Sequence, residues 1–264
     1  MDFNSVLFPI PKPQLLSETR LAPNVEVIYV PFQEKRDFSI LRLCSEPCTV
    51  INHIPCLFIP YSQGPAVYNN YESCDGERLK SPHNAKSGRL YSDKILIYFH
   101  GNAEDILQEQ TFKEKLAETL QVNVLIVEYP GYGPYKGSPA AWKLERDALF
   151  VYEYLMDKGV KAKDIMVLGR SIGSGPAAYL ASKHSIGLLI LMTAFTSIRG
   201  AAKDLVGPFL SRLVKQRFQN DLHVASLECP VFIIHGLEDE IIPWQHGQAL
   251  YQNCNSLKVG FSFP

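Results

Sequence analysis

One serine stands between two glycines at the end of an apolar run. Residues 165–168 are apolar and lead directly into Gly169-Arg170-Ser171-Ile172-Gly173. A serine on a sharp turn from a strand into a helix is a typical nucleophile, because the turn exposes its hydroxyl and the helix amides stabilise developing negative charge. The turn needs little bulk two residues before and after the serine, and both glycines provide this space. We therefore predict that Ser171 is the nucleophile of an acyl transfer.

The same stretch also fits a phosphate-binding pattern. Residues 173–178, Gly-Ser-Gly-Pro-Ala-Ala, match GxGxxA after an apolar run. A dinucleotide-binding fold places this pattern in its first βαβ unit and has an acidic residue after the next strand, about 20 residues on. Here the next apolar run, 188–192, leads into Thr193-Ala194-Phe195 with no acid, and other strand–helix units precede the pattern. The sequence favours the nucleophile, and we expect no cofactor.

Acyl transfer also needs donors for an oxyanion and an acid that orients a base. His100-Gly101-Asn102 follows the apolar run 95–99. Where a serine turn of this kind occurs, the loop after that strand donates one backbone N–H and the residue after the serine donates another. We therefore expect the amides of Asn102 (or Ala103) and Ile172 to form the oxyanion hole. The acid follows a later strand, where Glu238, Asp239 and Glu240 compete for the role.

Apolar runs alternate with helical periods around these residues. Continuous runs typical of buried parallel strands occupy residues 95–99, 122–127, 165–168, 188–192, 231–234 and 257–261. Helical spacing predicts helices near 112–120, 144–155, 172–184, 198–219 and 244–253. Runs at 25–30, 38–43 and 54–59 predict antiparallel or edge strands, and the polar residues 62–92 predict a surface insertion. The sequence thus predicts one α/β domain over residues 1–264, with a mostly parallel sheet, helices on both faces and sites at the carboxyl ends of the strands.

The segment 198–218 has room for only a small lid. It contains an apolar stripe made of Leu205, Phe209, Leu213 and Val214. Two interpretations stay open: the stripe lines a groove for an acyl chain, or it is the buried face of a helix.

Composition excludes several classes of protein. With 26 basic and 27 acidic residues in 264, the formal net charge is −1, so we expect no nucleic acid partner. The six cysteines show no zinc spacing, so we expect no metal and assign them as free thiols of a reducing compartment. We find no secretory signal and no apolar stretch of bilayer length, which predicts a soluble cytoplasmic protein. Residues 6–8, Val-Leu-Phe, are a candidate for peripheral membrane contact, with packing on the body of the protein as the alternative.

Several motifs together resemble a known family. They are HGNAED at 100–105, YPGYG at 129–133, GRSIGSGPA at 169–177, FTSIR at 195–199 and IIHGLEDEIIP at 233–243. The chain resembles α/β-hydrolases over about residues 5–260, and most of all the α/β-hydrolase domain-containing protein 17 group of palmitoyl-protein thioesterases. The resemblance implies a serine hydrolase that cleaves an acyl ester or thioester, such as palmitate on a protein cysteine or a lipid ester. The family pattern HGxxDxxxP places the triad acid at Asp239, which leaves Glu238 and Glu240 as loop charges.

Two features depart from that group. The group carries a cysteine cluster near the N-terminus, whereas the first cysteine here is Cys44. The family expects a catalytic histidine just after the last strand, whereas no histidine follows His246 in this sequence. We therefore expect the C-terminus to be incomplete. A catalytically silent protein that binds a lipid or a protein partner, and a serine peptidase of the same fold, remain as alternatives.

Overall fold

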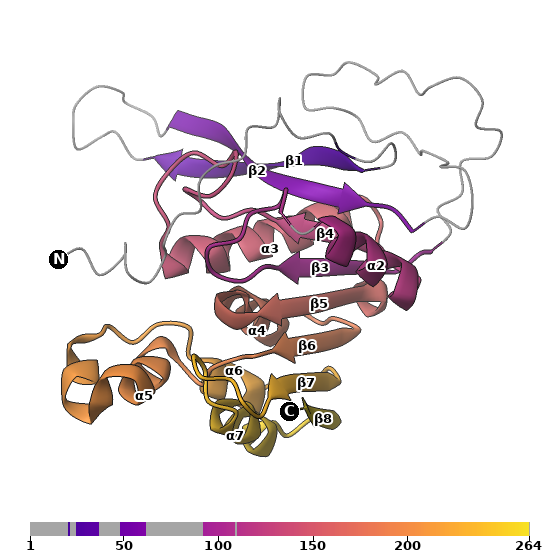
Figure 1. Cartoon of the computed structure of the whole chain (residues 1–264). Helices are drawn as coiled ribbons and strands as arrows, with labels where there is room; N and C mark the ends of the chain where they lie inside the picture. Colours follow the sequence, from indigo (N-terminus) through magenta and orange to yellow (C-terminus); the bar gives the residue numbers. More distant parts are fainter. Residues whose placement is uncertain (1–20, 22–24, 37–47, 62–91, 109, 264) are drawn as a thin grey trace, which may run out of the picture.

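A computed structural model describes residues 21, 25–36, 48–61, 92–108 and 110–263 of the chain. Within these residues a single sheet contains eight strands in the order β1-β2-β4-β3-β5-β6-β7-β8 (Figure 1). The strands are β1 (Glu26–Arg36), β2 (Cys48–Ile59), β3 (Ile95–Phe99), β4 (Asn123–Val127), β5 (Ile165–Arg170), β6 (Leu188–Met192), β7 (Val231–Gly236) and β8 (Lys258–Phe263). The helices are α2 (Gln110–Leu120), α3 (Ala141–Asp157), α4 (Ser174–Lys183), α5 (Ile198–Leu210), α6 (Asn220–Ala225) and α7 (Gln245–Asn253).

The sheet is parallel from β4 to β8, and antiparallel where β1 pairs with β2 and β2 with β4. Every residue of β3 and β4 is buried, because helices cover both faces of the sheet there. The predicted fold class is confirmed, including the antiparallel N-terminal strands that correspond to runs 25–30 and 54–59. The predicted strand 38–43 lies outside the described residues, as does almost all of the predicted insertion 62–92.

The helices divide between the two faces of the sheet. Side chains of α3, α4, α6 and α7 pack with one set of strand residues, which includes Ile97, Leu125 and Val167. On the other face α2 contributes Ala117 to a smaller core that contains Leu96 and Val124. No helix within the described ranges is long and apolar enough to cross a bilayer.

Helix α2 buries a different face from the one that its apolar spacing marks. The helix was predicted from Phe112, Leu116 and Leu120 at spacing four, but Phe112 and Leu120 are exposed. Lys113 and Ala117 are buried instead. The Lys113 ammonium finds backbone carbonyl partners inside the protein, so its long apolar stem can occupy a position that the pattern assigned to the polar face.

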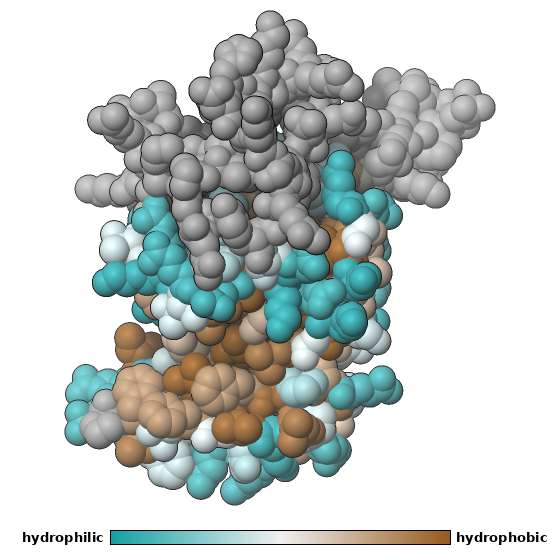
Figure 2. Space-filling view, turned by 90° about the vertical axis from the view of Figure 1, so that its right-hand side faces the viewer, coloured by the Kyte–Doolittle hydropathy of each residue, from teal (hydrophilic) through white to brown (hydrophobic). Residues whose placement is uncertain are grey.

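Strand β8 forms the outer edge of the sheet beside β7. Its side chains Val259, Phe261 and Phe263 are all exposed. Figure 2 shows the side of the molecule that lies on the right in Figure 1, with apolar side chains gathered in its lower half, at the level of β6 to β8. This part of the sheet is thus less covered than its centre.

Candidate active site

Ser171 occupies the turn between β5 and the helix that follows. A short 3₁₀ segment, η3 (Ser171–Gly173), connects β5 to α4. The backbone of Ser171 is left-handed, with φ of 51°, a conformation that costs a residue with a side chain roughly 1–2 kcal/mol. The Ser174 hydroxyl donates to the Ser171 carbonyl at 2.6 Å, and the Asn220 amide donates to the Ser174 oxygen at 3.0 Å. The side chain is therefore at the predicted strand-to-helix turn and not inside a regular helix.

The two flanking glycines allow the turn to pack tightly. A Cβ atom on Gly169 would lie 2.5 Å from the Gly173 carbonyl oxygen. A Cβ atom on Gly173 would lie 2.1 Å from the carbonyl oxygen of Phe99, the last residue of β3. Both distances are shorter than any ordinary contact between atoms. The space predicted for these two positions is confirmed, and the turn rests directly on the start of the loop that carries His100.

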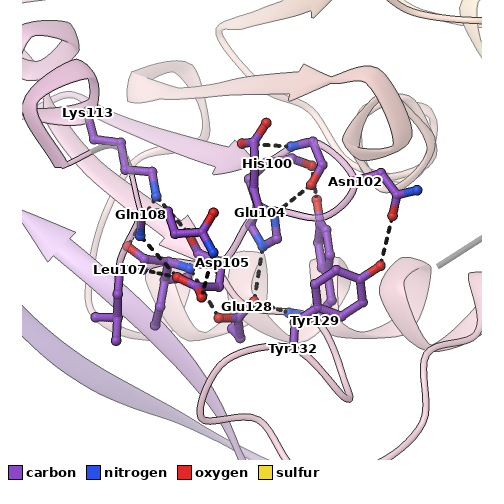
Figure 3. A network of polar contacts seen from close by, with 12 residues as sticks. His100, Asn102, Glu104, Asp105, Leu107, Gln108, Lys113, Glu128, Tyr129 and Tyr132 are labelled. Carbon is purple, nitrogen blue, oxygen red and sulfur yellow. Dashed lines mark hydrogen bonds and ion pairs between the residues drawn. The ribbon is translucent and has the colours of Figure 1, made fainter. Parts of the chain in front are cut away.

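The loop at residues 100–105 is held by a dense set of polar contacts (Figure 3). The Tyr129 hydroxyl donates to the His100 carbonyl at 2.7 Å, and the Tyr132 hydroxyl donates to the Asn102 side-chain oxygen at 2.8 Å. Ala103 has a φ of 60°, which marks the tightest point of the loop. Tyr129 and Tyr132 are buried, so these two side chains support the loop from inside. Burial raises the pKa of Tyr132, which keeps its hydroxyl a donor.

A buried histidine–glutamate pair lies beneath this loop. His100 Nε2 is 3.1 Å from Glu128 Oε1, and both side chains are fully buried. His100 Nδ1 lies 3.0 Å from the Gly101 carbonyl oxygen. Glu128 also accepts the backbone N–H groups of Tyr129 and Ile106, so one carboxylate connects the two loops.

Two further contacts fix the outer part of the loop. Glu104 forms an ion pair with Arg170, the residue before the serine, at 2.9 Å. The Lys113 ammonium donates to the carbonyl oxygens of Asp105 and Ile106 at 2.9 and 3.2 Å. The first contact ties the loop to the serine turn, and the second ties it to α2.

Asp239 lies on the loop after β7, on the side of the sheet where the carboxyl ends of β3 and β5 also lie (Figure 1). One oxygen of its carboxylate accepts the backbone N–H groups of Ile241 and Ile242 at 2.9 and 2.8 Å. The other oxygen is 3.8 Å from Nε2 of His235, which lies 2.7 Å from the Ile242 carbonyl oxygen. The loop therefore holds Asp239 in a fixed orientation. Glu238 and Glu240 are both less buried than Asp239 in this loop.

His246 has partners on two other segments. Its Nδ1 accepts the backbone N–H of Thr196 at 3.2 Å, which places the ring proton on Nε2. Nε2 lies 2.8 Å from a carboxylate oxygen of Asp204 on α5, a close contact that is not aligned as a hydrogen bond. Burial lowers the pKa of His246, an effect that Asp204 opposes.

The structure brings three of the four predicted site residues close together. Ser171 and Ile172 lie on the turn that packs against Phe99 and the loop of Asn102. Asp239 follows β7, with β6 between it and the serine strand. A triad acid contacts the histidine base and not the serine, so the position of Asp239 leaves its role as triad acid a prediction.

Sequence reasoning missed the residues that support the loop. The contacts of Glu128, Tyr132 and Lys113 to the loop join segments that are up to 30 residues apart. The signal in the sequence was Glu128, which directly follows the apolar run 122–127. A charged residue at such a place is rarely fully buried without a partner, so Glu128 pointed to a buried polar contact.

The sheet order, the parallel strands with helices on both faces and the serine turn define an α/β-hydrolase fold. The chain belongs to the family described as "Chlamydia CHLPS protein (DUF818)", whose model matches residues 92–241, more than half of the sequence.

Curated proteins and solved structures agree with the α/β-hydrolase fold. The chain is 32% identical over 161 residues to "Alpha/beta hydrolase domain-containing protein 17B" of Homo sapiens, an alignment that covers 60% of this chain and 54% of that protein. It is also 32% identical over 160 residues to "Alpha/beta hydrolase domain-containing protein aho-3" of Caenorhabditis elegans, which covers 60% and 47%. The chain thus spans about half the length of the curated relatives it matches.

Solved structures establish the fold. The esterase Pf2001 of Pyrococcus furiosus superimposes with a TM-score of 0.60 at 16% identity, covering 97% of this chain and 87% of that chain. An alpha-beta hydrolase from Vibrio vulnificus superimposes with a TM-score of 0.55 at 20% identity, covering 64% and 66%.

Proposed function

We propose that this chain is a serine hydrolase that cleaves an acyl ester or thioester through an acyl-enzyme on Ser171. The observation that carries the proposal is the left-handed backbone of Ser171 between Gly169 and Gly173. A strained residue persists only where its surroundings determine it, and such residues cluster at functional sites. A serine with no chemical role gains nothing from this conformation.

The proposed reaction begins with attack of the Ser171 oxygen on the acyl carbonyl carbon. The new C–O bond moves an electron pair onto the carbonyl oxygen, and the backbone N–H groups of Ile172 and Asn102 (or Ala103) donate to that oxyanion. Collapse of the intermediate expels the alcohol or thiol, which takes up a proton, and leaves the acyl group on Ser171. Water then attacks the acyl-enzyme in the same way, releases the acid and restores the serine hydroxyl.

In this proposal the proton of the serine passes to a histidine that Asp239 orients. We assign no particular histidine of this sequence to that role. His100, His235 and His246 are not assigned to this role, because each already has other partners: Glu128, the Ile242 carbonyl and Asp204 respectively. Without such a histidine the oxyanion hole still supports slow acylation, at a rate reduced by about a millionfold. A slow reaction of the 264-residue chain is therefore part of the proposal.

We propose the substrate from the resemblance to the α/β-hydrolase domain-containing protein 17 group. We propose a fatty acyl thioester of a protein cysteine, with a lipid ester as the alternative substrate. A serine oxygen attacks ester and thioester carbonyls more easily than amide carbonyls. Such substrates therefore suit a site to which no base is assigned. The esterase Pf2001, which shares the fold, supports hydrolysis of an ester in this proposal.

A fluorophosphonate probe tests the proposal on the protein itself, because such probes react with activated serines. We expect labelling at Ser171 that disappears in Ser171→Ala. Ser182→Ala, near the C-terminal end of α4 and away from the serine turn, is the matched control and keeps the labelling. Because the proposal includes a slow reaction, the labelling is followed over long exposure to the probe. A folded chain in which Ser171 then labels no faster than in its denatured state favours the catalytically silent alternative and overturns the proposal. Thioester, ester and amide substrates of the same acyl chain then separate thioesterase from peptidase activity.

A further inference from the structure

Helix α5 and the segment after it carry the most exposed apolar side chains near the candidate site. We call residues 198–217 the α5 hairpin; it consists of α5, the 3₁₀ segment η4 (Ser211–Leu213) and the return to Arg217. Five of its large apolar side chains are between 50% and 79% exposed: Leu205, Val206, Phe209, Leu210 and Leu213. They are not the buried face of a helix. Exposure of 79% for Phe209 also argues against a groove closed by walls of this chain.

The shape of the hairpin is fixed by contacts at its start and between its two sides. Ser197 caps α5 by accepting the Gly200 N–H at 3.0 Å. Arg199 Nε donates to the Val214 carbonyl at 2.9 Å, which joins the two sides of the hairpin. Gly207, with φ of 83°, and Pro208 bend the helix between its apolar residues. Figure 1 shows α5 set apart from the helices that cover the sheet, at the side where the parallel strands end.

The charge of the hairpin differs from that of the chain as a whole. It contains five basic residues, Arg199, Lys203, Arg212, Lys215 and Arg217, and only one acid. That acid, Asp204, has its carboxylate 2.8 Å from His246. The full chain has a formal net charge of −1, so positive charge is concentrated on this element.

We propose that the α5 hairpin docks the protein on an anionic lipid surface. Leu205, Phe209 and Leu213 enter the boundary between headgroups and acyl chains, while Lys203, Arg212 and Lys215 face the lipid phosphates. Apolar residues flanked by lysine and arginine on a preformed helical element are the features of an interfacial anchor. A protein partner could use the apolar residues alone, but the excess of basic residues matches a negatively charged membrane. The other candidate for membrane contact, residues 6–8, lies outside the described residues.

Docking would bring the carboxyl edge of the sheet, and with it Ser171, to the membrane. This consequence rests on the proposed function, because it matters only if the substrate carries a lipid-embedded acyl chain. The docking itself needs no catalysis.

Flotation of the full chain with vesicles tests the proposal. We expect binding to phosphatidylcholine vesicles that contain phosphatidylserine, weaker binding to phosphatidylcholine alone, and a decrease with salt. Phe209→Ser should weaken binding about tenfold. Lys215→Glu should weaken binding to the anionic vesicles only. Phe261→Ser, which alters a 57% exposed residue on β8, is the matched control and should bind like the unaltered chain.

The outcomes separate this proposal from the proposed function. Unchanged binding of Phe209→Ser, loss of binding in Phe261→Ser, or no binding of the unaltered chain each overturns the docking proposal. A dimer in solution that Phe209→Ser converts to monomer assigns the hairpin to self-association and also overturns it. Ser171→Ala should bind vesicles normally, and Phe209→Ser should keep its probe labelling without vesicles. Docking without labelling therefore refutes only the catalytic proposal. Melting curves confirm that each variant is folded.

Discussion

The contact between the serine turn and β3 makes Gly173→Ala a strong test of how the site is built. An added Cβ atom would lie 2.1 Å from the Phe99 carbonyl oxygen, 2.6 Å from the Phe99 carbonyl carbon and 2.7 Å from the His100 carbonyl oxygen. Cβ atoms essentially never approach another atom more closely than 3.0 Å, so Phe99 or the turn has to move by about 0.9 Å. All three atoms belong to the backbone, which no change of rotamer can move away.

The strand that would have to move is held on both sides. β3 pairs with β4 and with β5, and all five of its residues are buried. Overpacking of this kind costs typically 1–3 kcal/mol, and we expect Gly173→Ala to lower the free energy of unfolding by about 3 kcal/mol. A displacement near 1 Å at a catalytic group costs about 100-fold in rate. We therefore also expect probe labelling of Ser171 to slow by that factor.

Urea unfolding followed by circular dichroism measures the first effect, and it is independent of any activity. Gly236→Ala is the matched control, because its Cβ atom would meet nothing closer than 3.6 Å, a ring carbon of Phe263. We expect this variant to change the free energy of unfolding by less than about 1 kcal/mol. The prediction is wrong if Gly173→Ala lowers the free energy of unfolding no more than this control does and the probe labels Ser171 at the normal rate. The turn would then not pack closely on β3.

Two further predictions concern the loop and α3. Tyr132→Phe removes the donor to Asn102 but keeps the buried ring. We expect the free energy of unfolding to fall by about 1 kcal/mol and the probe to label Ser171 severalfold more slowly. Labelling at an equal rate would mean that this hydrogen bond does not position the loop. Burial raises the pKa of Glu145 to about 7, above its ordinary value of 4.5. Between these two pH values the folded state binds more protons than the unfolded state, so the free energy of unfolding falls as the pH rises. We expect Glu145→Gln to be more stable than the unaltered chain by about 1 kcal/mol at pH 8, allowing for screening of this partly exposed group, and to show no advantage near pH 4. A constant difference between the two proteins across this range in melting experiments would contradict the shift.

The sequence predicted the parallel part of the sheet well, for a physical reason. Strands such as 95–99 and 188–192 are apolar throughout, because helices cover both of their faces, and few other structures produce such short continuous runs. The serine turn was predictable for a related reason, since Gly169 and Gly173 are needed at fixed offsets from the serine.

The less successful predictions fail where local spacing does not decide burial. Lys113 is buried because its ammonium reaches two carbonyl groups of a loop that the helical period cannot reveal. The apolar stripe from Leu205 to Leu213 assumed an unbroken helix, but the backbone of Gly207 changes direction within it. The support of Asn102 by Tyr132 depends on tertiary packing between loops. Such contacts leave no periodic signal.

The left-handed backbone of Ser171 also bears on how this chain can change over generations. Glycine adopts that conformation freely, whereas serine is disfavoured there by the order of 1 kcal/mol. In a lineage released from any demand for chemistry, drift toward glycine at position 171 would make the fold more robust at no loss. A serine kept at that position in descendants would therefore signal that its hydroxyl is still under selection.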